Sequence, residues 1–451
     1  MSMSILIGLV NLIAEANFKE YYQNLKKNKF FLIVLLFFLF HLIALIWSDN
    51  LDYGLNDIRR KLSIIAVPLI LIAKPVNYRK EYKAILFCFI SALIITSLIN
   101  AISYFYFEDH FVFKDLRDMS LFNSHIRYAI MIALGVPILF ELVGGKKGIY
   151  LILPFVIWLL FYTYISQVLT GLISLFTILF AYILYKLIIE KKIKSLSFLI
   201  LSCAVGFGFF YVSLFSEPVS IEPTKANFSS MRHEWDKKSN RSFNGQDKRN
   251  QQLKYTLSRF LESKGLTKDA KGVKNLTEKE VRAVENGMAD ATEMKIGFWG
   301  RLEGLRYQIH HSNDPNGHSL LQRIEAWETG MEIIQDHPFV GVGTGDVDDA
   351  FKEKYAENQS ELIPINQIRA HNTYLTSMLT FGVLGLILFL FLLYSYLKAQ
   401  LDYRQMMGFI FMMVMAVTFL FEDTLETQTG ITLFSFFAAL YSIPMHSAKN
   451  D

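Results

Sequence analysis

Long runs of apolar residues, separated by short charged connections, dominate this chain of 451 residues. Hydrophobic residues make up 52% of the sequence, and they gather in runs instead of being spread evenly as they are around soluble cores. A helix needs roughly 20 apolar residues to cross the hydrocarbon core of a bilayer. Because lipid offers no partner for backbone N–H and C=O groups, such runs must be helical. The sequence therefore predicts an all-α polytopic membrane protein.

Ten apolar runs are candidates for membrane-spanning helices. They lie near residues 30–47, 60–73, 84–106, 126–143, 149–165, 168–189, 195–215, 373–397, 404–421 and 428–445. The run at 60–73 is short, so it could also be tilted, interfacial or paired with residues further upstream. Residues 4–17 are apolar and short, and could be the remnant of a further span; no basic region precedes them, so they do not resemble a signal peptide. We expect about 10–12 transmembrane helices.

The short connections alternate in charge, and this alternation predicts the orientation. One set holds basic residues: Lys26, Lys27, Lys29, Lys74, Arg79, Lys80, Lys83, Lys146, Lys147, Lys186, Lys191, Lys192, Lys194, Lys398 and Arg404. The alternate set holds acidic residues: Asp49, Asp52, Asp57, Glu108, Asp109, Asp115, Asp118, Glu422, Asp423 and Glu426. Cytoplasmic loops carry an excess of lysine and arginine, so the first set and the C-terminus are predicted to lie inside.

The chain is predicted to have three parts. Residues 1–216 form an N-terminal transmembrane bundle, residues 217–370 form one large outer segment, and residues 371–451 form the C-terminal transmembrane helices. The net charge of +4 needs no nucleic acid to explain it, because much of the basic excess belongs to cytoplasmic loops. Cys88 and Cys203 both lie in predicted spans, so we expect no disulfide framework.

The outer segment divides into two halves. Residues 222–296 are hydrophilic, which favours a partly mobile surface insertion, although 277–294 could form a helix capped by Thr277. In the second half, apolar residues at helical spacing predict an amphipathic helix over 319–335, and a second one follows at 347–355. These helices are expected to lie along the rim of the membrane and to pack over the bundle.

Two features of this second half favour anion binding. Arg323 and Trp327 share a helix face, and a guanidinium matches phosphate oxygens bidentately, but a lone arginine at an interface is often only snorkelling. Residues 341–346 read Gly-Val-Gly-Thr-Gly-Asp and lack the Gly-Lys-Ser/Thr ending of a nucleotide P-loop. The amides of Gly343 and Gly345 could approach an anion, while a tight structural turn explains the same spacing equally well.

Metal binding is the weaker interpretation. The acidic run at 346–349 has no second ligand cluster, and acidic residues near a helix N-terminus are common. His310, His311 and His318 lack a matching carboxylate or cysteine spacing, so surface histidines are the default. We therefore predict neither a metal site nor a cofactor.

A histidine at the membrane surface is the sharpest candidate for chemistry. His371 and Asn372 stand where the outer segment runs back into an apolar helix, for which asparagine is a good cap. A histidine just outside the hydrocarbon can titrate near neutral pH and act as a general base, although a lone histidine is more often structural.

A second set of basic residues stands on the outer side, against the charge rule. Arg59, Arg60 and Lys61 precede one span, and His125 and Arg127 open another. Ionisable groups near membrane depth are costly and usually mark a bound polar group. Together with Arg323 they would suit a lipid pyrophosphate; contact with lipid head groups is the alternative.

In combination these motifs resemble the O-antigen ligase and polymerase family. The resemblance rests on Arg-x-x-x-Trp at 323–327, Pro-Phe-x-Gly-Val-Gly-Thr-Gly-Asp at 338–346, and His-Asn-x-Tyr-Leu at 371–375 followed by a Gly-Val-Leu-Gly helix. Residues 57–69 also resemble the early spans of Bacteroidetes-type members. The likeness extends to the topology, with many spans, one large outer loop late in the chain and few spans after it.

The resemblance implies a GT-C-like membrane glycosyltransferase in the bacterial inner membrane, with its large loop in the periplasm. It implies inverting, metal-independent transfer of a glycan from undecaprenyl pyrophosphate to an acceptor hydroxyl. The acceptor is a lipid A core sugar in a ligase and a second lipid-linked repeat in a polymerase; some relatives glycosylate proteins. Arg323 would bind the pyrophosphate and His371 would activate or position the acceptor. A transporter of lipid-linked glycans is a further alternative, but the predicted spans have few ionisable residues at their centres.

One stretch departs from the family pattern. Many members carry an arginine directly after a serine. This pair stands near the start of the second-last span before the large loop. Here residues 166–171 read Ser-Gln-Val-Leu-Thr-Gly, without an arginine. Either Arg127 or the Arg59–Arg60 pair is expected to supply this charge, or the donor is bound in a different way.

Overall fold

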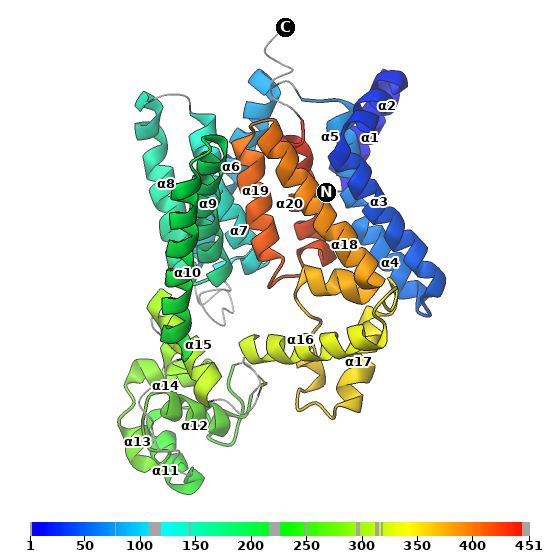
Figure 1. Cartoon of the computed structure of the whole chain (residues 1–451). Coiled ribbons are helices and arrows are strands. Elements are labelled where there is room, and N and C mark those ends of the chain that lie inside the picture. The colour runs from blue at the N-terminus through cyan, green and yellow to red at the C-terminus, as the bar shows by residue number, and fades with distance from the viewer. Residues whose placement is uncertain are drawn as a thin grey trace.

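The computed structural model describes residues 2–76, 78–107, 119–143, 146–215, 226–248, 251–294, 298–311, 315–316 and 319–443. Helices account for the regular structure of these residues, which contain one isolated bridge and no named strand (Figure 1). This confirms the all-α polytopic membrane fold. His318, one of the histidines considered for a metal, lies outside the described residues.

Thirteen of the described helices form a bundle. They are α1 (Ser2–Glu15), α2 (Phe18–Lys27), α3 (Lys29–Ile43), α4 (Leu51–Lys61), α5 (Ser63–Ala73), α6 (Lys83–Tyr106), α7 (His125–Leu142), α8 (Lys146–Ser166), α9 (Leu169–Ile189), α10 (Ile193–Phe215), α18 (Thr373–Asp402), α19 (Met406–Thr418) and α20 (Gln428–Tyr441). A large apolar core runs through it, from Phe30 in α3 to Tyr441 in α20. The contacts of α20 with α5 and of α19 with α9 join the two ends of the chain.

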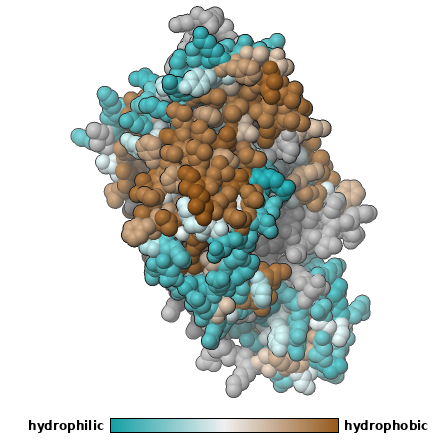
Figure 2. Space-filling view, turned by 90° about the vertical axis from the view of Figure 1, so that its right-hand side faces the viewer, coloured by the Kyte–Doolittle hydropathy of each residue, from teal (hydrophilic) through white to brown (hydrophobic). Residues whose placement is uncertain are grey.

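Six segments among the described residues are long and apolar enough to cross a membrane. They are Lys29–Trp47, Lys80–Tyr106, His125–Leu142, Gly148–Ser166, Leu169–Ile189 and Thr373–Asp402. The run predicted at 60–73 is split, because α4 ends at Lys61 and α5 has only 11 residues. The last two predicted runs form α19 and α20, of 13 and 14 residues. Apolar side chains form a broad band between polar surfaces, as expected for a multi-pass membrane protein (Figure 2).

The first half of the outer segment has a core of its own. It folds into α11 (Phe228–Lys238), α12 (Leu253–Ser263), α13 (Ala270–Lys274) and α14 (Glu278–Glu285), which lie beyond the end of α10 (Figure 1). Met231, Trp235 and Phe260 are completely buried in this unit. The expectation of a partly mobile surface insertion did not include this core, for which a few well-spaced apolar side chains suffice.

The predicted helix at 277–294 is only partly right. The expected cap is present, since Thr277 and Glu280 form a capping box at the start of α14. The helix ends at Glu285, however, because Gly287 follows with φ +88°, a conformation that stops a helix.

The second half of the outer segment lies across the end of the bundle (Figure 1). It contains α15 (Phe298–His311), α16 (Ser319–Asp336) and α17 (Val347–Glu357), so both predicted amphipathic helices are confirmed. Ile333 of α16 and Phe351 of α17 share a buried cluster with Leu379 of α18. This cluster holds the outer helices against the first turns of α18.

A break inside α18 completes this attachment. Gly382 has φ +67°, and the irregularity leaves the Leu379 and Thr380 carbonyls free to accept hydrogen bonds from the Val342 and Gly343 amides at 2.8 and 3.1 Å. The Val383 amide in turn donates to the Pro338 carbonyl at 2.9 Å. The glycine-containing turn after α16 is therefore bonded to the backbone of α18.

Gly382→Ala is expected to destabilise the protein. An alanine at this φ is strained by about 1–3 kcal/mol, and its Cβ would lie 2.2 Å from the Phe339 carbonyl carbon. We expect thermal denaturation in detergent to show a Tm lowered by at least about 2 °C. Gly206→Ala is the matched control, because a Cβ there meets no atom within 4 Å. Equal Tm values for the two variants would contradict the predicted strain.

Candidate functional site

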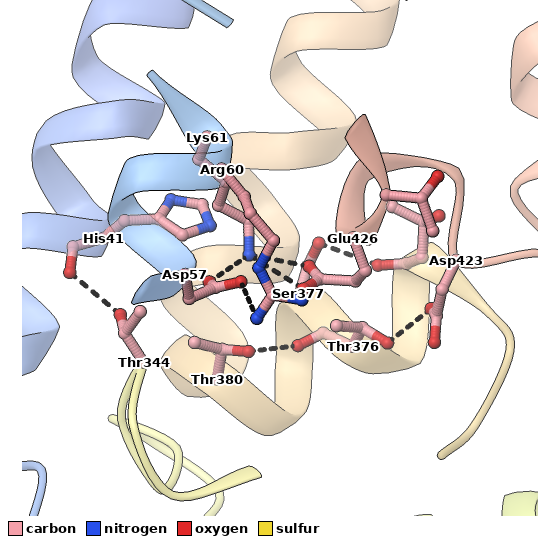
Figure 3. A network of polar contacts seen from close by, with 12 residues as sticks. His41, Asp57, Arg60, Lys61, Thr344, Thr376, Ser377, Thr380, Asp423 and Glu426 are labelled. Carbon is pink, nitrogen blue, oxygen red and sulfur yellow. Dashed lines mark hydrogen bonds and ion pairs between the residues drawn. The ribbon is translucent and has the colours of Figure 1, made fainter. Parts of the chain in front are cut away.

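The connection between α19 and α20 is held against the start of α18 by hydrogen bonds. The Thr373 amide donates to the Phe419 carbonyl at 2.9 Å, and the Thr373 hydroxyl donates to the Glu422 carbonyl at 2.8 Å. One turn later, the Thr376 hydroxyl donates to the Asp423 carboxylate at 2.7 Å (Figure 3). The first turn of α18 thus fixes the backbone that carries two acidic side chains.

The buried carboxylate of Glu422 brings three predicted site residues together. Its Oε1 accepts a hydrogen bond from Arg323 Nη2 at 2.5 Å. Its Oε2 lies 4.0 Å from Arg127 Nη2 and 3.9 Å from His371 Nδ1. We call these four residues the Glu422 cluster. Arg323 comes from α16, Arg127 from α7 and His371 from the residue pair before α18, so three separate parts of the chain meet at one carboxylate.

Local contacts explain how His371 reaches this position. Asn372 caps α18 as predicted, accepting hydrogen bonds from the Tyr374 and Leu375 amides at 3.0 and 3.1 Å. Trp327, one turn after Arg323, donates through its indole N–H to the Ala370 carbonyl at 2.6 Å. Between these two anchors His371 adopts φ +45°, a left-handed conformation that is uncommon for a residue with a side chain. Such local strain persists only where the surrounding contacts enforce it.

Electrostatics make His371 suitable as a base. Burial lowers the pKa of its imidazole, Arg323 and Arg127 lower it further, and Asp423 acts in the opposite direction. The imidazole is therefore neutral at pH 7, and a neutral ring can accept a proton. Burial raises the pKa of Glu422, but the same two arginines oppose that shift. Its direct contact with Arg323 favours the ionised carboxylate.

A second set of buried charges lies beside the first. Lys61 of α4 contacts Asp57 at 2.5 Å and Glu426 at 2.8 Å (Figure 3). Arg369 lies 3.6 Å from Glu426. We call these four residues the Lys61 network. Burial alone would lower the pKa of Lys61, but Asp57 and Glu426 outweigh burial and raise it. The network ties α4 and the α19–α20 connection to Arg369, two residues before His371.

The basic residues predicted on α4 and α7 have different surroundings. Lys61 is buried among acidic partners, Arg60 lies 3.4 Å from Asp57 and over the Tyr53 ring, and Arg59 is exposed. His125, the first residue of α7, is partly buried two positions before Arg127. Of these five, the structure brings Arg127 into contact with the Glu422 cluster.

The amides of the glycine turn are used within the protein. Gly343 donates to the Thr380 carbonyl, as described above, and Gly345 donates to the Ser48 hydroxyl at 3.0 Å. The Asp346 carboxylate accepts from the Asp49 and Asn50 amides at 2.8 Å each. These contacts match the structural interpretation of the turn, and they speak against a phosphate held by the amides of Gly343 and Gly345. The turn instead joins α17 to the start of α4.

The helix that carries Arg127 packs against the stretch that departs from the family pattern. Residues 166–171 form the connection from α8 into α9, and a Cβ at Gly171 would lie 3.1 Å from the Cβ of Ala129. Ala129 is two residues from Arg127 on α7. The guanidinium therefore comes from the helix that packs directly against this stretch.

The Glu422 cluster is separate from a cavity of about 360 Å³ at the other end of α18. That cavity is lined by Asn24, Lys27, Asn28, Lys29, Phe30, Ile72, Pro75, Ser395, Tyr396, Ala399, Gln400, Tyr403, Ser442 and Ile443. The cavity is lined by residues from the last turns of α18, whereas the cluster lies at the start of this helix.

Four residues of this region were missed by reasoning from sequence. Glu422, Asp423 and Glu426 were used only to predict orientation, and Arg369 was not considered. One signal was present in the sequence: three acidic residues stand within five positions at the end of an apolar run, on the side where His371 was expected. Carboxylates that become buried at the end of an apolar run need cationic partners, and the arginines predicted for the site could serve as such partners.

The chain also matches a known family. A family model described as O-antigen ligase covers residues 154–390, more than half of the chain. Arg323 and His371 lie in the matched part, whereas Arg127 precedes it and Glu422 follows it. Among curated proteins none matches the chain.

Proposed function

Since the chain belongs to the O-antigen ligase family, we propose that it is an inverting, metal-independent glycosyltransferase that takes its glycan from undecaprenyl pyrophosphate. The family makes the chain a membrane enzyme of the ligase or polymerase type, acting on lipid-linked glycans. The acceptor in our proposal is a hydroxyl of the lipid A core, so the reaction is O-antigen ligation in lipopolysaccharide biosynthesis. The proposed location is the bacterial inner membrane, with the outer segment in the periplasm and the C-terminus in the cytoplasm.

The observation that carries this proposal is the meeting of two arginines and a neutral histidine at Glu422. The Arg127, Arg323 and His371 side chains are partly buried, with 14, 25 and 35% of their surfaces exposed. Guanidinium groups in such a water-poor place bind phosphate oxygens strongly. A neutral imidazole next to them can receive the proton of an incoming hydroxyl.

The proposed mechanism is a single displacement. The acceptor oxygen attacks the anomeric carbon from the face opposite the pyrophosphate, so the bond from that carbon to the phosphate oxygen breaks and the configuration inverts. Arg323 and Arg127 stabilise the negative charge on the departing undecaprenyl pyrophosphate. The hydroxyl proton passes to His371. No reacting group has to be activated by a metal, because the donor already carries a good leaving group and the arginines neutralise it.

The second candidate is an O-antigen polymerase. It uses the same donor chemistry, with the hydroxyl of another lipid-linked repeat as the acceptor, and the family match supports it equally. Glycosylation of a protein hydroxyl would need the same cluster as well. A transporter of lipid-linked glycans would need no base, so the neutral His371 between two arginines favours the enzymes.

Deletion of the gene in its host separates the ligase from the polymerase. For the ligase we expect the surface glycan ladder to disappear while full-length polymer remains on undecaprenyl pyrophosphate. The measurement is gel analysis of surface glycans together with extraction of lipid-linked intermediates. Cores capped with a single repeat, or an accumulation of single-repeat donors, would identify the polymerase instead. An unchanged ladder and unchanged intermediates would contradict both.

His371→Ala is expected to reduce transfer by about 10²–10⁴-fold, because the variant lacks the base. In the wild type, kcat/KM for the donor, which reports the donor-free enzyme, should stay constant down to about pH 6.5, the ordinary pKa of histidine. It should fall only below that pH, since the lowered pKa keeps the imidazole deprotonated until then. The measurement is transfer to purified acceptor by protein reconstituted in vesicles. His337→Ala, at an exposed histidine after α16, is the control. Full activity of the His371 variant would exclude it as the base.

Arg323→Lys is expected to lower transfer by about 10²-fold, although it keeps the positive charge. A lysine presents one ammonium and cannot make the forked contact of a guanidinium with phosphate oxygens. The same vesicle assay applies, with Arg232→Lys on α11 as the control, because Arg232 is exposed and pairs only with its neighbour Asp236 among the described contacts. If both variants transferred glycan at the wild-type rate, Arg323 would be structural.

A further inference from the structure

The cations proposed to hold the donor are already paired in this structure. Glu422 Oε1 accepts from Arg323, and Glu422 Oε2 faces Arg127. Only 2% of the Glu422 surface is exposed, so the carboxylate is sheltered from water, while its two arginines stay partly exposed. A diphosphate carries its own negative charges and seeks the same guanidinium groups. The carboxylate and the diphosphate must therefore compete for them.

The other neighbour of Glu422 lacks a hydrogen-bond partner. His371 Nδ1 is buried and has none, and the nearest carboxylate oxygen, Glu422 Oε2, lies 3.9 Å away. This distance exceeds a hydrogen bond by about 1 Å. A small rotation of the Glu422 side chain away from the arginines would close it. The backbone stays in place during this rotation, because the hydrogen bond from the Thr373 hydroxyl holds the Glu422 carbonyl.

We propose that Glu422 is an exchangeable counter-ion: it neutralises Arg323 and Arg127 in the empty enzyme, and it is transferred to His371 when the donor diphosphate takes its place. In its second position the carboxylate accepts a hydrogen bond from Nδ1–H of His371. It thereby fixes the tautomer whose Nε2 lone pair receives the acceptor proton, and it stabilises the imidazolium that forms. Glu422 is a positioning residue in this scheme. The role of His371 in this inference rests on the proposed function. The competition of Glu422 and a diphosphate for the two arginines does not depend on the proposed function.

Two physical arguments support the exchange. The diphosphate brings like charge close to the carboxylate, so both anions on the same guanidinium groups repel each other, and the carboxylate is the one that can rotate away. His371 meanwhile needs a negative partner, because proton transfer from the acceptor makes it a cation among arginines. The described charges around it are Arg127, Arg323, Arg369, Glu422 and Asp423, and Glu422 is the one that becomes free on donor binding. The base is then fully formed only when the donor is present.

The test compares binding and turnover in Glu422→Gln. Inorganic pyrophosphate is the binding probe, titrated into full-length protein in detergent, and transfer is measured in vesicles. Removing the competing charge should tighten pyrophosphate binding by about 10-fold. The amide cannot stabilise an imidazolium or fix the reactive tautomer, so kcat should fall by about 10²-fold or more. Glu353→Gln, at an exposed position of α17, is the control and should change neither value.

Other outcomes separate the failure of this proposal from the failure of the proposed function. Weaker or unchanged pyrophosphate binding in Glu422→Gln would mean that the carboxylate does not compete with the donor. Tighter binding with wild-type kcat would mean that it does not assist His371. If Glu422→Gln fails to fold, Glu422→Asp replaces it: the retained charge should keep pyrophosphate affinity near wild type, while the shorter side chain lowers kcat, and a normal kcat would refute the role. If the wild type transfers no glycan but the binding change appears, the proposed function fails and the counter-ion role survives.

Discussion

The buried carboxylate of Glu422 is the constraint on which the arrangement of this end of the molecule depends. An ionised group that is 2% exposed costs several kcal/mol unless cations and hydrogen bonds surround it. The bundle supplies one cation, Arg127 of α7, and the outer segment supplies the closer one, Arg323 of α16. The amphipathic helix that crosses the bundle end is thus held by apolar packing on one face and by this ion pair at its beginning.

His371, the base in our proposal, is positioned by the contacts of the residues next to it in the chain and not by contacts of its own side chain. Ala370 before His371 accepts from Trp327, Arg369 lies in the Lys61 network, and Asn372 after it caps α18. The left-handed backbone at His371 and its unpartnered Nδ1 are tolerated because the residues on both sides are fixed. The fixed backbone at His371 places its imidazole beside Glu422, where the proposed reaction needs a base.

Reasoning from sequence succeeded where the signal is local. Apolar runs predicted the membrane helices, and spacing of three or four residues predicted α16, the Thr277 capping box and the Asn372 cap. It failed where a contact joins distant positions. Glu422 and Arg323 are 99 residues apart, and each sequence neighbourhood alone has an ordinary explanation, namely a charged outer loop and a snorkelling arginine. The core of α11–α14 was missed for the same reason, because its few apolar residues become a core only when four helices meet.

The missing arginine at residues 166–171 is a case in which geometry can substitute for sequence. Packed helices lie about 8–10 Å apart, axis to axis, so two helices in contact can present a guanidinium to the same point from different backbones. Gly171 packs against Ala129, whereas Arg127, two residues earlier, lies on the opposite face of that helix, with its Nη2 4.0 Å from Glu422 Oε2. What the proposed reaction needs is a fixed positive charge beside Arg323, not an arginine at a given position of the chain. Our proposal therefore assigns to Arg127 the charge that the family pattern places after Ser166.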